Sequence, residues 1–596
     1  MIRYYGRRRL GRLSTPYSVR STAGRSALSV LSAVCLLTIC LLTICSWLSP
    51  LYASQAATDD APGDLYIETM NVNLVNVDVY VTDKKGRRVH DLKVEDFEVF
   101  EDGRPVKVTN FFAMKEGVPA VETVATLDRP DQAPADGPKP AVDLPVDQQL
   151  HLIVYIDNLH IRPFNRNKVL QRVRNFLRTK MQKNSQAMLV TFERSLKIRE
   201  GFTGDLDRIS EATYELEDLS AFTVQRETER DNIIKRILRT ENPQEAESHA
   251  DFYAKSVYAD LEMSIRGMRE MVSILAGLPG RKALLYVSDG LEMRAGEDLF
   301  LLAIQEHPRL DTHGGVTMQT ARYDGRRRFQ ELIAQANANR VTFYTMEAAG
   351  LRSHSSLSAE RSGGVSTIDI DFSYQMNRQE SLLMLADDTG GLATISTNNF
   401  AGALENMAQD FGSYYSLGYS PAHSGDGRFH RIEVKVKKPG LKVRHRDGYR
   451  DKSQTTRINE GTLASLLHDT ETNPLGVEVK FLEPGLDARG DLVLPVEVRI
   501  PIQEMALLPR AGIYRGKMLI SLAVMDDEGE TSPVQMVPVP VEVPEADIEV
   551  ARTKYYVYSA GLQIRPGRQK IAVGVRDDVA GRQTYLSRSK VVGPRR

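Results

Sequence analysis

The residues His151-Leu152-Ile153-Val154-Tyr155-Ile156-Asp157-Asn158 give the strongest indication of the fold class of this chain. The first six of them form an almost unbroken apolar run, which is typical of a strand buried on both faces of a parallel sheet. Segments with strand-like and helix-like patterns alternate from this run to about residue 421. The alternation predicts an α/β fold with a doubly wound, mostly parallel sheet that is covered by helices on both faces.

Further elements of the same kind follow the first strand. Buried strands are predicted at residues 187–192, 283–287 and 341–344. Apolar residues recur at helical spacing in five other segments, namely 169–177, 206–216, 257–275, 329–336 and 382–411. Residues 224–250 are polar and are interpreted as a stretch that leads into the long third helix.

The predicted α/β domain, residues 149–421, is flanked by segments with the two-residue period of β-strands. Residues 64–116 form a predicted N-terminal β module, with a hairpin turn at Glu101-Asp102-Gly103. Residues 117–148 are rich in Pro, Ala and Asp and are interpreted as a linker. The aromatic segment 414–419 is interpreted as the last core strand of the α/β domain, and residues 422–450 as a closing β hairpin.

The C-terminal part of the chain, residues 461–592, is predicted to be all β and to form a small sandwich-like domain of immunoglobulin size. Alternation of apolar and polar residues predicts strands in five segments, namely 477–481, 492–500, 518–525, 534–543 and 570–575.

The N-terminal residues are typical of an export signal. Seven arginines between Arg3 and Arg25 precede an apolar run without acidic residues over 27–48. Residues 1–56 are therefore predicted to be either a cleaved signal peptide or an uncleaved membrane anchor. Both alternatives place the rest of the chain outside the cytoplasm, in the periplasm, in the outer envelope or in the medium.

Composition excludes several classes of function. The chain has 77 Lys and Arg against 78 Asp and Glu, so its net charge does not favour binding to nucleic acid. Contact with a membrane is expected only through an uncleaved anchor. All three cysteines lie in the N-terminal apolar run, and the exported part has neither a disulfide framework nor a thiol nucleophile.

Two aspartates mark the candidate site. Asp157 and Asp289 each follow a predicted strand, and the carboxyl ends of parallel strands are the edge at which ligands bind in open α/β sheets. Two carboxylates together with a hydroxyl are suitable ligands for a hard divalent cation such as Mg²⁺ or Ca²⁺.

The order of several motifs resembles the VWFA-related family known mainly from acidobacteria, which contains a von Willebrand factor A-like (VWA) domain. The resemblance covers residues 70–450 and depends on four motifs, namely Val81-Thr82-Asp83 to Gly86, Glu95 to Gly103, Tyr414 to Pro421 and Arg431 to Val436, together with the two strands that end in Asp157 and Asp289. It implies an α/β domain of VWA type and a role in binding or adhesion.

VWA domains bind a cation through a metal-ion-dependent adhesion site, whose first motif is Asp-x-Ser-x-Ser. The resemblance matches Asp157 to the first aspartate, Asp289 to the aspartate of the third motif and Thr223 to the threonine. Leu159 and Ile161 occupy the two serine positions, however, and neither residue can bind a cation. His160 lies between them, outside the ligand positions. The sequence therefore predicts a degenerate site that either holds Mg²⁺ or Ca²⁺ weakly or is free of metal.

No sequence motif of a common hydrolase, zinc protease or nucleotide-binding enzyme occurs in the chain. We therefore expect an exported, non-enzymatic binding protein that contacts a protein or a component of the cell envelope. Two alternatives stay open. The first is a structural scaffold of the envelope whose β modules make the contacts, and the second is a hydrolase with catalytic residues assembled from distant positions.

Overall fold

The stretch from Leu150 to Asp157 forms β6, a strand in the middle of a six-stranded sheet in the computed structural model of the chain. The sheet has the order β11-β10-β9-β6-β7-β8. All neighbouring pairs are parallel except β7 and β8, which are antiparallel. The other strands are β7 (Gln186–Phe192), β8 (Leu196–Thr203), β9 (Arg281–Ser288), β10 (Val341–Glu347) and β11 (Ala393–Thr394). The predicted mostly parallel sheet is confirmed.

The structure describes residues 74–120, 148–181, 185–220, 222–311, 315–351 and 367–593. These residues all belong to one of the two units into which the chain divides. The predicted export signal, residues 1–56, lies outside the described residues, as do residues 121–147 of the predicted linker.

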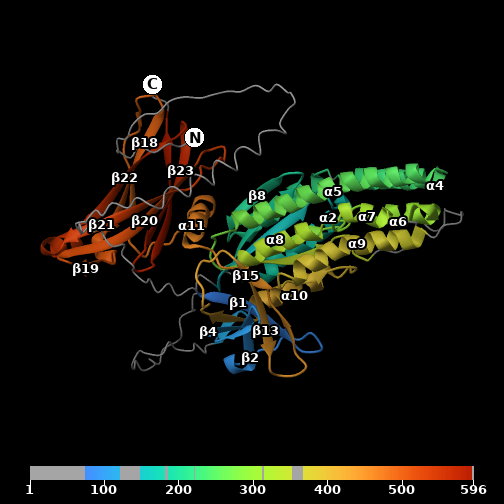
Figure 1. Cartoon of the computed structure of the whole chain (residues 1–596), viewed down its shortest axis with the longest axis horizontal. Helices are drawn as coiled ribbons and strands as arrows, with labels where there is room; N and C mark the ends of the chain where they lie inside the picture. The colour runs from blue at the N-terminus through green and yellow to red at the C-terminus, as the bar shows by residue number, and fades with distance from the viewer. Residues whose placement is uncertain are drawn as a thin grey trace, which may run out of the picture. The chain divides into compact units, whose positions relative to one another are not determined.

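Helices cover both faces of the sheet because successive side chains of a strand point to opposite sides. Leu152, Val154 and Ile156 pack against α2 (Pro163–Lys180), α3 (Leu206–Glu215) and α10 (Phe400–Gly412). Ile153 and Tyr155 pack on the other face, against α5 (Pro243–Ile274), α8 (Arg326–Ala338) and α9 (Thr367–Asp387). Figure 1 shows α5, α8 and α9 lying side by side along the sheet.

Helices that come before and after β9 in the chain form an extension with a core of its own. It contains α4 (Thr223–Arg239), the first half of α5, α6 (Glu297–Glu306) and α7 (Gly315–Arg322). Sequence analysis assigned no helix to the polar stretch 224–250, but α4 forms there and presents one narrow apolar face with Ile233, Ile234 and Ile237. These side chains are buried against Tyr253, Leu299 and Phe300.

Segments from before and after the α/β domain build one β module together. One sheet has the order β14-β1-β12-β4-β5 and the other has the order β15-β13-β2-β3. A single core contains residues from both sheets, among them Val77, Val99, Leu417 and Val434. The strands are β1 (Val75–Thr82), β2 (Phe97–Glu101), β3 (Arg104–Val106), β4 (Asn110–Lys115), β5 (Val118–Ala120), β12 (Tyr414–Tyr419), β13 (Phe429–Val436), β14 (Lys442–Arg444) and β15 (Gly448–Arg450).

This pairing differs from the sequence interpretation at three places. β12 lies between β1 and β4 and is not a strand of the α/β sheet. The hairpin predicted over 422–450 does not form, since β13 pairs with β2 and β15 whereas β14 pairs with β1 in the other sheet. The first residues of the predicted linker form β5, which pairs with β4. The α/β domain is therefore inserted between β5 and β12 of the β module.

The C-terminal part begins with a helix, α11 (Gln454–His468), which the prediction of an all-β segment missed. Two antiparallel sheets follow, and each of the five strands predicted there is confirmed. The first sheet contains β16 (Glu478–Phe481), β17 (Gly485–Leu486), β18 (Leu492–Pro501) and β22 (Tyr555–Gln563). The second contains β19 (Leu508–Arg510), β20 (Ile513–Met525), β21 (Gln535–Pro544), β23 (Gly567–Asp577) and β24 (Gln583–Val592).

Candidate functional site

The two predicted aspartates lie together at the carboxyl edge of the sheet. The parallel pairing of β6 with β9 aligns Ile156 with Val287, so Asp157 and Asp289 follow at the same edge. Both carboxylates are buried. Both residues also contact His160, because Oδ1 of Asp157 accepts the His160 N–H at 3.3 Å and the Asp289 N–H donates to the His160 carbonyl at 2.8 Å.

Protein donors occupy both oxygens of Asp157. Oδ1 accepts the backbone N–H of Leu159 at 3.2 Å as well as that of His160. Oδ2 accepts the Tyr286 hydroxyl at 2.5 Å and lies 3.1 Å from Nδ1 of His160. Burial and the neighbouring Asp157 carboxylate raise the pKa of the Tyr286 hydroxyl, which keeps that donor protonated. Asp157 thus closes the turn that follows β6.

Asp289 is bound at the start of α2. Its Oδ2 accepts the backbone N–H of Arg162 at 3.0 Å, and Nδ2 of Asn165 lies 3.2 Å from Oδ1 and 3.1 Å from Oδ2. Negative charge at this end of a helix interacts favourably with the helix dipole. The carboxylate therefore fastens β9 to α2.

Thr223, the first residue of α4, is brought to the same loop. Its hydroxyl lies 3.1 Å from the Leu159 carbonyl and 3.0 Å from the Ile161 carbonyl, and it is the donor to both. The side chains of Leu159 and Ile161 are buried in the cores on opposite faces of the sheet. All three predicted ligands are thus gathered around residues 157–162. A cation at this place would have to displace hydrogen bonds that these residues already make.

Asp157, His160 and Ser264 form a group that resembles a catalytic triad in composition only. Oγ of Ser264 lies 3.3 Å from Nδ1 of His160, the same nitrogen that faces Asp157. In a serine hydrolase the serine and the carboxylate contact opposite nitrogens of the imidazole. The arrangement does not supply a base for the Ser264 hydroxyl.

A pocket of about 230 Å³ lies beside His160. Three of its charged side chains are paired, because Arg226 is bound to Glu229 at 2.6 Å and also to Asp260. The Arg226 guanidinium also donates a hydrogen bond to the Oγ of Ser256 at 2.7 Å. Arg194 also lines the pocket, and its guanidinium lies 5.0 Å from the centroid of the Phe222 ring.

Large apolar side chains are exposed on segments that border the carboxyl edge. They are Phe164 in the first turn of α2, Leu351 after β10, and Phe372 and Met376 in α9, with exposed fractions of 79%, 66%, 55% and 47%. The helix α9 reaches the candidate site, since Nε of Arg378 donates to the Gly290 carbonyl at 3.1 Å. Sequence analysis missed these residues. Phe164 alone carried a usable signal, because it lies outside the helical apolar pattern that begins at Val169.

No family model matches the chain, and no curated protein matches it. Solved structures that are similar to it include an aerotolerance-related membrane protein from Bacteroides fragilis, with 10% identity, 44% of this chain and 98% of that chain covered, and a TM-score of 0.19. The conserved hypothetical protein BatB from Bacteroides thetaiotaomicron has 11% identity over 44% of this chain and 96% of its own, with a TM-score of 0.17.

A von Willebrand factor type A protein from Catenulispora acidiphila is also similar, with 9% identity, 75% of this chain and 67% of that chain covered, and a TM-score of 0.19. The α/β assignment rests on the strand order and register described above. Within the described ranges, no helix combines the length and the apolar character that a membrane span requires.

Proposed function

We propose that this chain is an exported, non-enzymatic binding protein whose VWA-like domain contacts a protein or a cell-envelope component through the carboxyl edge of its sheet. The proposal includes membership of the VWFA-related family and sandwich-like β modules on both sides of the domain. The exposed apolar side chains Phe164, Leu351, Phe372 and Met376 carry it. A contiguous patch of large exposed apolar side chains is typical of a surface that another molecule covers.

The chemistry of these four side chains favours a macromolecular partner. Aromatic and methionine side chains are enriched at protein interfaces relative to the rest of the protein surface. Covering such a side chain removes apolar surface from water, at about 25 cal/mol per Å².

The proposed contact does not depend on a bound cation. Asp157 and Asp289 already accept hydrogen bonds from the Leu159 amide, the Tyr286 hydroxyl, the Arg162 amide and the Asn165 side chain. Mg²⁺ requires near-octahedral oxygen coordination and loses its water reluctantly, so a few carboxylate oxygens that are already bonded are poor ligands. We therefore expect EDTA to leave partner binding unchanged.

Photo-crosslinking in cells tests the proposal. A benzophenone amino acid is introduced at Phe164 or Phe372, and at Tyr555 on β22 of the C-terminal part as a control, which is an aromatic residue with an exposed fraction of 42%. We expect defined adducts of the envelope fraction at Phe164 and Phe372, unchanged by EDTA, and none at Tyr555. Adducts of equal yield at all three positions, or adducts that EDTA abolishes, would overturn the proposal.

The same experiment separates the second candidate function, an envelope scaffold that binds through its β modules. The observation that favours a scaffold is the exposure of Leu486, Val557 and Val591 in the C-terminal part, with exposed fractions of 55%, 41% and 65%. Adducts at Tyr555 without adducts at Phe164 or Phe372 would favour the scaffold and contradict contact through the carboxyl edge.

A further inference from the structure

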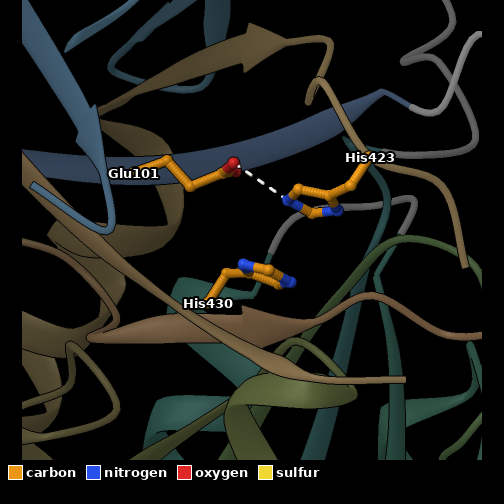
Figure 2. Close-up of side chains that lie close together, drawn as sticks. All are labelled: Glu101, His423 and His430. Carbon is orange, nitrogen blue, oxygen red and sulfur yellow. Dashed lines mark hydrogen bonds and ion pairs between the residues drawn. The ribbon is translucent and has the colours of Figure 1, made fainter. Parts of the chain in front are cut away.

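The β module holds a cluster of imidazole and carboxylate groups away from the candidate site. Glu101 ends β2, His430 belongs to β13 and His423 lies in the loop between β12 and β13. Strand pairing gathers them, since β13 pairs with β2 through Ile432 and Glu101 and with β15 through His430 and Tyr449. Figure 2 shows the Glu101 carboxylate beside His423, with the two imidazole rings one beneath the other.

Each of the four ring nitrogens in the cluster faces a carboxylate oxygen. The pairs are His423 Nε2 with Glu101 at 3.0 Å, His423 Nδ1 with Asp451 at 2.9 Å, His430 Nδ1 with Asp102 at 2.8 Å and His430 Nε2 with Asp426 at 3.2 Å. A neutral imidazole has one N–H and one lone pair. One nitrogen of each neutral ring would therefore direct a lone pair at a carboxylate, which is repulsive unless a cation lies between them.

Two of the pairs, His423 Nδ1 with Asp451 and His430 Nε2 with Asp426, have the geometry that orients a metal-binding histidine. We call these the outer pairs and the other two ring nitrogens the inner nitrogens. In metal sites the second ring N–H of a ligating histidine usually donates to a carboxylate, which fixes the ring and its tautomer. Asp451, whose side chain is fully buried, holds Nδ1 of His423 in this way, and Asp426 holds Nε2 of His430. Both inner nitrogens, His423 Nε2 and His430 Nδ1, are then left for an ion.

Glu101 is oriented by two tyrosines. Its Oε2 accepts the Tyr419 hydroxyl at 2.6 Å and the Tyr449 hydroxyl at 3.0 Å. The other oxygen, Oε1, is the atom that faces His423. The side chain of Glu101 is buried, and these bonds leave it little freedom to turn away.

We propose that Glu101, His423 and His430 form a binding site for a divalent transition-metal ion of the Zn²⁺ class. One donor atom from each residue lies within 4.8 Å of the others. Imidazole together with carboxylate is a donor set that suits Zn²⁺, whereas Mg²⁺ and Ca²⁺ prefer oxygen alone. Asp102 follows Glu101 and faces the inner nitrogen of His430, but it does not belong to the group of donors that lie within 4.8 Å of one another.

Binding of the ion requires a small movement of His423. The two rings are stacked, with centroids 3.8 Å apart and planes at 16°, and two parallel rings cannot both direct a lone pair at one ion. The His423 side chain is 26% exposed and belongs to a loop, whereas His430 is buried in a strand. His423 therefore tilts toward the ion, and the metal fastens the loop after β12 to β2 and β13.

Calorimetric titration of the EDTA-treated full chain with ZnCl₂ tests the site. We expect one Zn²⁺ per chain and a raised melting temperature, while MgCl₂ gives neither. His423→Gln is expected to abolish this binding without unfolding the protein, because the side chain is partly exposed. His249→Gln, on α5, is the matched control and should bind Zn²⁺ as the unchanged chain does.

A positioning residue provides a second measurement. Asp451→Asn keeps all three ligands but weakens the hold on His423, so Zn²⁺ affinity should fall by about 10–100-fold. Co²⁺ in place of Zn²⁺ should give visible absorption bands that His423→Gln removes. Absence of a stoichiometric Zn²⁺ site, or equal affinity in His423→Gln and His249→Gln, would overturn the proposal and leave protons as the cations of the cluster.

Discussion

The side-chain amide of Asn165 lies against both carboxylate oxygens of Asp289, 3.2 Å from Oδ1 and 3.1 Å from Oδ2. This contact joins an amide from the first turns of α2 to the loop after β9. The carboxyl edge of the sheet is held together by hydrogen bonds that link β6, β9, α2 and α4.

Mg²⁺ should stabilise the protein very little. A millimolar concentration of an ion that binds with a dissociation constant above millimolar adds less than about 0.5 kcal/mol to the free energy of unfolding. Calorimetric melting with and without MgCl₂ measures this contribution. A micromolar affinity that Asp157→Ala abolishes would show that the site is functional and that adhesion depends on a cation.

Replacing Thr223 by valine should destabilise the protein, because the hydroxyl bridges the Leu159 and Ile161 carbonyls. Loss of a buried donor that leaves its acceptors unpaired costs about 1–3 kcal/mol. Urea unfolding of Thr223→Val measures the change. Thr228→Val is the matched control on the same helix, since Thr228 is exposed and bonds only to the Val224 carbonyl. Equal losses in the two variants would contradict the bridging role.

The stability of the protein should fall as the pH drops from about 6.5 to about 4, in part because of His151. Burial, with a smaller effect of the nearby Lys282 ammonium, lowers the pKa of His151 from 6.5 to about 4. Between these values the unfolded chain binds a proton that the folded chain does not, so the free energy of unfolding decreases with falling pH.

The variant His151→Leu removes this contribution. Between pH 7 and pH 5 it should lose about 1–2 kcal/mol less stability than the unchanged protein, as measured by urea unfolding at each pH. His249→Gln is the control and should follow the unchanged protein. If His151→Leu had the same pH dependence as the unchanged protein, the imidazole would have to be charged or solvated in the folded state.

Replacing Gly290 by alanine should cost more than the same change at Gly529. Both glycines have positive φ, +92° and +84°, so an alanine is strained at either position. A Cβ at Gly290 would also lie 2.6 Å from the backbone oxygen of Arg378, whereas at Gly529 it meets nothing within 4 Å. We expect Gly529→Ala to lose about 1–2 kcal/mol and Gly290→Ala at least about 1 kcal/mol more, because α9 must shift. Equal losses of the free energy of unfolding, measured by urea unfolding, would show that α9 can shift without destabilising the protein.

The sequence predicted the parallel sheet because its strands are buried on both faces and appear as apolar runs. The same burial on both faces led to the wrong sheet assignment for β12. All six residues of Tyr414–Tyr419 are buried, so their pattern does not tell which sheet the strand joins. The α4 helix was missed because its apolar face is narrow and most of its other residues are charged or polar.

The candidate site was predicted in part. The ends of the predicted strands indicated the positions of Asp157 and Asp289. The sequence did not indicate the role of Asn165, because asparagine in a first helical turn is common. Sequence analysis missed the imidazole and carboxylate cluster, although His423, Asp426 and His430 lie close together in the sequence. Glu101 and His423 are 322 positions apart and meet only through the pairing of β2 with β13.

The insertion of the α/β domain into the β module has a mechanical consequence. α10 ends at Gly412 and β12 begins at Tyr414, so a pull on the α/β domain passes directly into β12. That strand is bonded on one edge to β1 and on the other to β4. A force along it is resisted in shear by two ladders of hydrogen bonds that must break together. The β module thus anchors the α/β domain against tension.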